Sequence, residues 1–142
     1  MKEKLLISAC LMGDNVKYNG SNNKIDIEKL EKEYTLISFC PEVEGGLPIP
    51  RPPAEMVCDE PLKLINIEGK NVTKEFILGA KKAVMLAQQE GITKALLKAK
   101  SPSCGKGEIY DGTFLGVLRE GDGVTVRLLE EIGVKVYNEN NW

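Results

Sequence analysis

Short apolar runs alternate with amphipathic helical segments along this chain of 142 residues, and the alternation limits the folds open to it. Strands that alternate with helices of this length form a parallel sheet with helices on its faces. The sequence therefore predicts one α/β domain over residues 1–142, a mainly parallel sheet flanked by helices in a Rossmann-like three-layer arrangement. The expected strands are residues 4–9, 35–39, 95–99 and 134–137, and the expected helices are 26–34, 73–90 and 124–132.

Three segments fall outside this alternation. Residues 45–53 contain two glycines and four prolines, so they form neither a helix nor a central strand. Residues 62–67 alternate apolar and polar side chains, which predicts a short exposed strand or a hairpin arm. Residues 109–118 are interrupted by glycine and receive no assignment. Thr73 is expected to cap the longest helix, which Gly91 ends.

The composition excludes several classes of function. The chain has no histidine, which rules out Ser-His-Asp and Cys-His catalysis and zinc held by imidazole. Its formal net charge of −2 argues against general nucleic-acid binding, because neutralising phosphates supplies most non-specific affinity. The sequence also lacks an apolar run near the roughly 18 residues of a membrane-spanning helix. A protein without membrane association is expected.

The four cysteines do not resemble a disulfide scaffold, since such chains are usually shorter, secreted and dense in cysteine. The apolar stretch before Cys10 covers only residues 5–9, whereas a signal peptide needs about 7–15 apolar residues. A cytoplasmic protein is therefore expected. Its cysteines should be reduced, and reduced cysteines serve as metal ligands or catalytic groups more readily than as bridges.

Three of the cysteines follow expected strands: Cys10 the first, Cys40 the second and Cys104 the third. The carboxyl ends of parallel strands share one edge of a sheet, where ligands bind, so these thiols are expected to converge. Three thiolates without histidine suit zinc or an iron–sulfur cluster. Because the cysteines are far apart in sequence, they favour a cluster with one iron left open over a four-ligand zinc site. Cys58 is expected to be a buried thiol. If it were instead a fourth ligand, it would occupy the open coordination position of that iron.

Five segments resemble the thiouracil desulfidase (TudS-like) family, long known as a bacterial domain of unknown function. Singly these segments are weak signals, but together they cover essentially the whole chain and their order is specific. The matching segments are Ile7-Ser8-Ala9-Cys10, Cys40-Pro41-Glu42-Val43-Glu44-Gly45-Gly46-Leu47-Pro48, Pro50-Arg51-Pro52-Pro53-Ala54-Glu55, Leu97-Lys98-Ala99-Lys100-Ser101-Pro102-Ser103-Cys104-Gly105 and Ile109-Tyr110-Asp111-Gly112-Thr113-Phe114.

The resemblance implies a [4Fe-4S] cluster held by Cys10, Cys40 and Cys104, with one iron that has no protein ligand. Aerobic preparation would remove this cluster. The resemblance also implies an enzyme that hydrolyses the thiocarbonyl of thiouracil or a thiolated uridine nucleotide to the oxo form plus sulfide, without net redox change. A small-molecule substrate is expected, although the resemblance leaves the thiolated substrate open between base, nucleotide and, as in fused family members, tRNA. The oligomeric state is also open. Two other classes also remain: a non-catalytic cluster or zinc sensor or carrier, and a cysteine persulfide carrier.

Without histidine, a carboxylate is the natural base for the attacking water. Glu42 lies two residues after Cys40, and burial there would raise its pKa toward a useful range. Glu44 has the same access, but the resemblance favours Glu42. Ser101 is expected to act in catalysis and Ser103 in substrate binding, as hydroxyl donors. Both serines are also ordinary turn-forming residues.

Basic residues flank the segments that are expected to form the site. Arg51 is the best candidate for binding a phosphate, because its guanidinium matches phosphate bidentately. Together with Lys17 it favours a thiolated nucleotide over a bare base. The alternative is that these side chains only keep the surface soluble. The basic residues in question are Lys17, Arg51, Lys98, Lys100 and Lys106.

Overall fold

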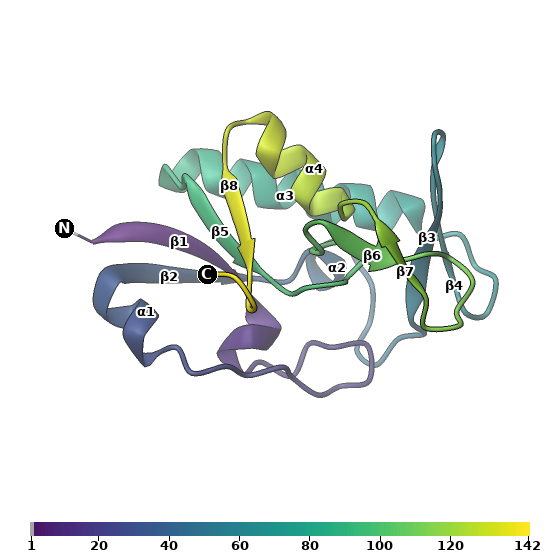
Figure 1. The fold of residues 1–142 in the computed structure, drawn as a ribbon, viewed down its shortest axis with the longest axis horizontal. Helices are drawn as coiled ribbons and strands as arrows, with labels where there is room; N and C mark the ends of the chain where they lie inside the picture. The colour runs from purple at the N-terminus through teal and green to yellow at the C-terminus, as the bar shows by residue number, and fades with distance from the viewer. Residues whose placement is uncertain (1) are drawn as a thin grey trace.

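The computed structural model describes residues 2–142, which fold around a four-stranded sheet of order β2-β1-β5-β8 (Figure 1). All three strand pairs within the sheet are parallel. The predicted α/β fold with a mainly parallel sheet is therefore confirmed, and each of the four expected strands is present within two residues of its expected bounds. The strands are β1 (Glu3–Ser8), β2 (Tyr34–Phe39), β5 (Lys94–Leu97) and β8 (Lys135–Asn138).

Helices cover the two faces of this sheet unequally. Helices α3 (Thr73–Glu90) and α4 (Val124–Glu131) lie side by side on one face, and α1 (Glu28–Glu33) lies on the other (Figure 1). Alternating residues of β1 separate the two layers: Leu6 packs with α3 and α4, whereas Leu5 and Ile7 pack with α1. This alternation is the period-two pattern of a strand that is buried on both faces.

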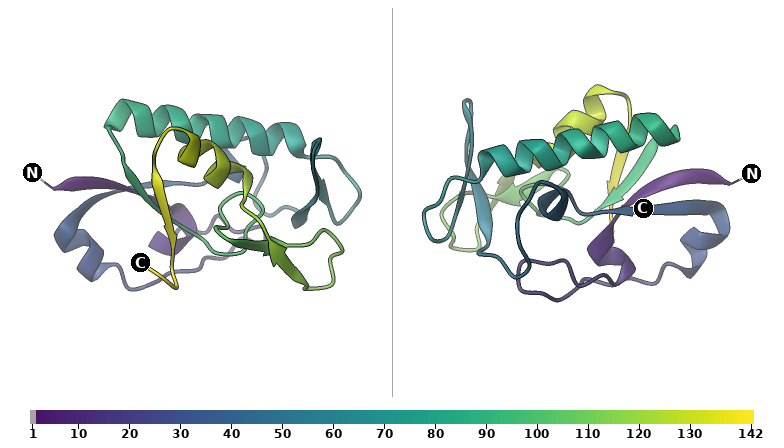
Figure 2. Two further views of the ribbon diagram at one scale, coloured as in Figure 1. Left: turned by 45° about the horizontal axis from the view of Figure 1, so that its top comes forward. Right: turned by 180° about the vertical axis from the view of Figure 1, so that it is seen from behind.

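Two small hairpins extend the molecule beyond the amino end of α3 (Figure 2). They are β3 (Ala54–Asp59) with β4 (Leu62–Asn66), and β6 (Glu108–Tyr110) with β7 (Leu118–Glu120). The hairpin arm expected at 62–67 is confirmed as β4, although its Leu64 is fully buried rather than exposed. Strand β3 was not predicted, and the pair β6–β7 occupies the region left without assignment.

The expected capping role of Thr73 is not observed. Val72 occupies the cap position of α3 and the helix shows no side-chain cap. The hydroxyl of Thr73 instead accepts a hydrogen bond from the backbone N–H of Leu64, at 2.9 Å. Thr73 therefore ties α3 to β4, while Gly91 ends the helix in the left-handed conformation as expected.

The four-residue helix α2 (Pro41–Glu44), which was not predicted, packs its backbone directly against α3. A Cβ atom at Gly79 would overlap the carbonyl oxygen of Pro41, and a Cβ atom at Gly45 would overlap the carbonyl oxygen of Glu75. Two glycines thus allow an approach that no other residue permits. This contact fixes α2, and with it the position of the residues that follow β2.

Among residues 2–142, none of the helices combines the length and the apolar composition that crossing a membrane requires.

Candidate active site

One cavity of about 530 Å³ opens at the carboxyl ends of the sheet strands. Cys10 reaches it from the 3-10 helix η1 (Ala9–Met12), which directly follows β1. Cys40 reaches it from the junction of β2 and α2, and Cys104 from the loop after β5. All three thiols are free, as is Cys58, which lies on β3 and is not part of the cavity lining. The structure thus brings together the three cysteines that follow strands.

Burial governs the ionisation of these three thiols. It raises the pKa of Cys10 and of Cys40 above their ordinary value, and raises the pKa of Cys104 furthest. After burial and an opposing hydrogen bond from Ser8, the charges of Cys40, Glu42 and Cys10 also contribute to raising the pKa of Cys104. Without a bound metal group, the three thiols are therefore protonated at neutral pH. A metal group would bind to them with release of protons.

The donor set fits a multinuclear group better than a single ion. Three soft sulfur ligands select zinc, copper(I) or iron–sulfur groups. Across residues 2–142, however, no three Cys, Asp or Glu side chains lie close enough to hold one metal ion. A cubane is several ångströms across and holds its ligand sulfurs farther apart than one ion does. The cavity has room for such a group.

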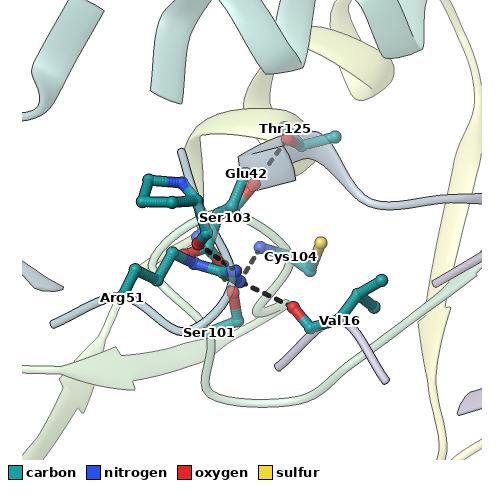
Figure 3. Close-up of polar contacts among 8 residues, drawn as sticks. Val16, Glu42, Arg51, Ser101, Ser103, Cys104 and Thr125 are labelled. Atoms are coloured by element: carbon teal, nitrogen blue, oxygen red, sulfur yellow. Dashed lines mark hydrogen bonds and ion pairs between the residues drawn. The ribbon is translucent and has the colours of Figure 1, made fainter. Parts of the chain in front are cut away.

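Glu42 lines the cavity from α2, and Arg51 holds its carboxylate (Figure 3). Arg51 Nε lies 3.3 Å from Glu42 Oε1, and the two side chains are 5% and 21% exposed. Burial raises the pKa of Glu42, and the charge and hydrogen bond of Arg51 limit that rise. Glu44, two residues on, is exposed and absent from the lining. Geometry therefore favours Glu42 over Glu44 as a base.

Arg51 lines the cavity, but its guanidinium is engaged by internal acceptors. Besides Glu42 it donates to the carbonyl oxygens of Val16, at 2.9 Å, and Pro48, at 3.3 Å (Figure 3). The phosphate contact expected for this residue does not agree with that arrangement, because three guanidinium nitrogens already bind internal acceptors. Arg51 instead connects its own proline-rich segment, residues 45–53, to the loop that contains Val16.

The two candidate serines occupy different environments (Figure 3). Ser101 lines the cavity, and its Oγ accepts hydrogen bonds from the backbone N–H groups of Ser103 and Cys104 at 3.1 and 3.0 Å. Its hydroxyl hydrogen remains available for a substrate. Ser103 is fully buried, and its Oγ lies 2.8 Å from the Oγ1 of Thr125. The expectation that Ser103 binds substrate therefore finds no support, since its hydroxyl is turned away into the core.

The basic residues also separate into groups. Lys17, Lys98 and Lys100 line the cavity. Lys98 Nζ lies 2.6 Å from Glu139 Oε2, so its charge is already paired. Lys106 lies elsewhere and pairs with Asp122 and Glu130.

Several lining residues were not singled out from the sequence. Asn23 donates a hydrogen bond from Nδ2 to Cys10 Sγ, at 3.6 Å. Glu55 accepts hydrogen bonds from the backbone N–H groups of Gly112 and Phe114, and thereby holds the loop after β6. Asn23 is one of several asparagines in a turn-rich loop, and nothing in the sequence distinguishes it from its neighbours.

Comparison with known proteins identifies the family to which this arrangement belongs. A family model described as 2-thiouracil desulfurase matches residues 5–141. The chain belongs to the 2-thiouracil desulfurase family. The thiouracil desulfidase resemblance is thereby confirmed, and with it the expectation of an enzyme that removes sulfur from thiouracil.

Two relatives extend this result to specific proteins. The uncharacterised protein YbbK of Bacillus subtilis (strain 168) is 39% identical over 144 residues, which cover 96% of this chain and 95% of YbbK. The solved structure of TudS, a [4Fe-4S]-dependent thiouracil desulfidase, is 44% identical and superposes with a TM-score of 0.89. That superposition covers 98% of this chain and 92% of TudS. The two chains therefore share one fold over nearly their full lengths.

Proposed function

We propose that this protein is an iron–sulfur-dependent desulfidase that hydrolyses the thiocarbonyl of a thiolated uracil. The reaction exchanges the C=S bond for C=O, takes its oxygen from water and releases the sulfur as sulfide without net redox change. The observation that carries the proposal is that three thiols from loops after strands and one partly buried carboxylate line a single cavity. The family and the named activity of the similar TudS structure support the same reaction.

The three lining cysteines, Cys10, Cys40 and Cys104, would hold a [4Fe-4S] cluster. When bound, the cluster supplies one iron without a protein ligand, a Lewis acid for the thiocarbonyl sulfur. Cys58 lies on β3, outside the lining, and is left free. Reduced thiols at the site agree with a cytoplasmic protein.

Glu42 acts as the general base. Its carboxylate takes a proton from the attacking water, and burial makes it a stronger base than a solvated glutamate. Arg51 keeps the carboxylate in place through the Nε contact at 3.3 Å. Ser101 donates its hydroxyl hydrogen to the substrate ring, while two backbone amides fix the position of its oxygen.

The substrate is a small thiolated uracil compound, and a phosphorylated form fits the mouth of the cavity. Lys17 and Lys100 both line the cavity, and either can meet a phosphate. Lys98 is less suited to this role because Glu139 neutralises it. The overall charge of −2 continues to disfavour general binding of nucleic acid.

The test compares two glutamates of one helix in anaerobically reconstituted protein. Glu42→Gln should lower the rate of sulfide release from thiouracil by roughly 10²–10⁴-fold and leave iron content unchanged. Glu44→Gln is the matched control and should behave like wild type, since Glu44 is exposed. Equal rates of sulfide release for Glu42→Gln and wild type would show that Glu42 is not the general base.

The cysteines are tested on the same samples. Cys104→Ala should lose iron and visible absorbance, whereas Cys58→Ala should keep both. Wild-type protein that binds iron but releases no sulfide from thiouracil or thiouridine monophosphate would indicate a sensor or carrier. Iron-free protein that is active and carries a persulfide would indicate a persulfide carrier.

A further inference from the structure

Each of the three cavity thiols has a hydrogen-bond donor near it that lowers its pKa against the larger effect of burial. At Cys10 the donor is Asn23, whose Nδ2 lies 3.6 Å from Sγ. The backbone N–H of Asn23 also donates to the carbonyl oxygen of Cys10, at 3.0 Å. Asn23 therefore donates two hydrogen bonds to Cys10, one to its backbone carbonyl oxygen and one to its sulfur. This geometry leaves the amide little freedom to turn elsewhere.

At Cys104 the donor is Ser8, the last residue of β1. Ser8 is 3% exposed, and its Oγ accepts the backbone N–H of Lys98 at 2.9 Å. A hydroxyl has one hydrogen to donate, and the Ser8 hydroxyl lowers the pKa of Cys104 against the larger effect of burial. The backbone N–H of Lys98 fixes the position of this oxygen, and Ser8 lines the same cavity as Cys104.

At Cys40 the donors are backbone amides of Val43 and Glu42, the residues of α2 that follow it. These donors cannot be removed by substituting a side chain. Asn23 and Ser8 are different, because each provides its hydrogen bond from a side chain that the catalytic steps above do not use.

Hydrogen bonds to ligand sulfurs have a defined effect on iron–sulfur groups. They withdraw electron density from the thiolate, so the sulfur donates less to iron, and they shift the reduction potential to more positive values. The same withdrawal makes an open iron a stronger Lewis acid. A cluster used for hydrolysis rather than electron transfer benefits from both fixed ligands and an electron-poor iron.

We propose that Asn23 and Ser8 are positioning residues for the cluster, each donating a hydrogen bond to one ligand sulfur and thereby securing retention of the cluster and the acidity of its open iron. The proposal rests on the function proposed above. It adds two residues to the site that neither participate in proton transfer nor ligate metal.

The test uses wild-type and variant proteins reconstituted anaerobically with iron and sulfide. Asn23→Asp keeps the shape of the side chain but replaces the donor to sulfur with a carboxylate oxygen. Asn23→Leu removes the donor without adding charge, and Ser8→Ala removes the donor at Cys104. Asn15→Asp is the matched control, since Asn15 is exposed in the same loop and only accepts a hydrogen bond, from Asn22.

The readouts are the midpoint potential of the cluster and the rate at which its visible absorbance decays with an iron chelator. Asn23→Asp, Asn23→Leu and Ser8→Ala should each shift the potential to more negative values and speed cluster loss about tenfold or more. Asn15→Asp should match wild type in both. Wild-type potential and retention in Asn23→Asp and Ser8→Ala would overturn the proposal.

The outcome for wild type separates this inference from the proposed function. Wild-type protein that takes up no cluster would overturn both. Wild-type protein that carries a cluster and releases sulfide, alongside Asn23 and Ser8 variants with unchanged potential and retention, would overturn only the inference about the two donors.

Discussion

Arg51 Nε lies 3.3 Å from Glu42 Oε1, and the side chain of Arg51 is 5% exposed. The same guanidinium reaches the carbonyl oxygens of Val16 and Pro48, so one side chain joins three segments that border the thiol cavity. The position of the candidate base thus depends on a residue nine positions away in sequence. Arg51 therefore has a structural role, because it holds these segments together around the cavity.

Replacing Arg51 should therefore impair folding stability as well as activity. Arg51→Ala leaves the Glu42 carboxylate and two carbonyl groups without their partner, and should lower the free energy of unfolding by about 3 kcal/mol. Arg51→Lys should recover part of that loss, because an ammonium cannot reproduce the planar fork. Urea denaturation measures both. Unchanged stability with a raised KM for thiouridine monophosphate alone would return Arg51 to the phosphate role expected from the sequence.

The contact between α2 and α3 makes a second prediction. In Gly79→Ala the new methyl group would overlap the carbonyl oxygen of Pro41, so α2 must move. Overpacking of this kind costs about 1–3 kcal/mol, and the shift should also displace Cys40 and Glu42. Gly79→Ala is therefore expected to lower both the thermal midpoint and the iron content after reconstitution. Gly69→Ala is the control, because a Cβ atom there meets nothing and only its positive φ of 87° strains the turn.

Ser103 and Thr125 form a buried hydroxyl pair, and this pair allows a thermodynamic cycle. Ser103→Ala leaves the Thr125 hydroxyl without its partner and should cost about 1–3 kcal/mol of stability. Adding Thr125→Val should recover much of that loss, since both polar groups are then gone. Neither variant should change KM, and the apparent kcat should fall only in proportion to the fraction of protein that is folded. A raised KM in fully folded Ser103→Ala would place the hydroxyl in substrate binding after all.

The sequence predicts the central sheet well because its strands carry their own signal. Each is a short apolar run that is bounded by turn residues, and parallel pairing follows from the helices between them. The convergence of Cys10, Cys40 and Cys104 follows from that topology alone. The small hairpins carry less signal: β6 and β7 are three residues each, and β3 directly follows a run of prolines.

The roles of individual polar side chains are harder to predict because their partners are distant. Arg51 binds Val16, 35 residues away, and Ser103 binds Thr125, 22 residues away. Both residues look free in the sequence, so both were expected to meet substrate. Glu42 was identified because it lies two residues after Cys40 and because the family resemblance favours it over Glu44, whereas its contact with Arg51 was not predicted. Asn23 was missed because its one distinguishing feature, the contact with a sulfur, exists only in the folded chain.

Glu139 makes the last prediction, which concerns pH. Although burial opposes its ionisation, hydrogen bonds from Lys98 and the backbone N–H of Ala99 hold the pKa of Glu139 below its ordinary value of 4.5. As the pH falls, Glu139 therefore takes up a proton at a higher pH in the unfolded chain than in the folded chain. Between these two pKa values the free energy of unfolding rises with pH. The contribution of Glu139 is fully present above pH 4.5 and is lost as the pH falls through the lower, folded-state pKa.

Glu139→Gln keeps an acceptor for Ala99 but removes the ion pair with Lys98, which has a side chain 29% exposed. The variant should be less stable than wild type at pH 7 by about 1 kcal/mol, and the difference should shrink as the pH is lowered below 4.5. Urea denaturation at a series of pH values measures this convergence. Glu131→Gln, at an exposed position of α4, should run parallel to wild type throughout. A constant gap between Glu139→Gln and wild type down to pH 3 would show that the carboxylate charge contributes nothing to stability and that the loss comes from packing.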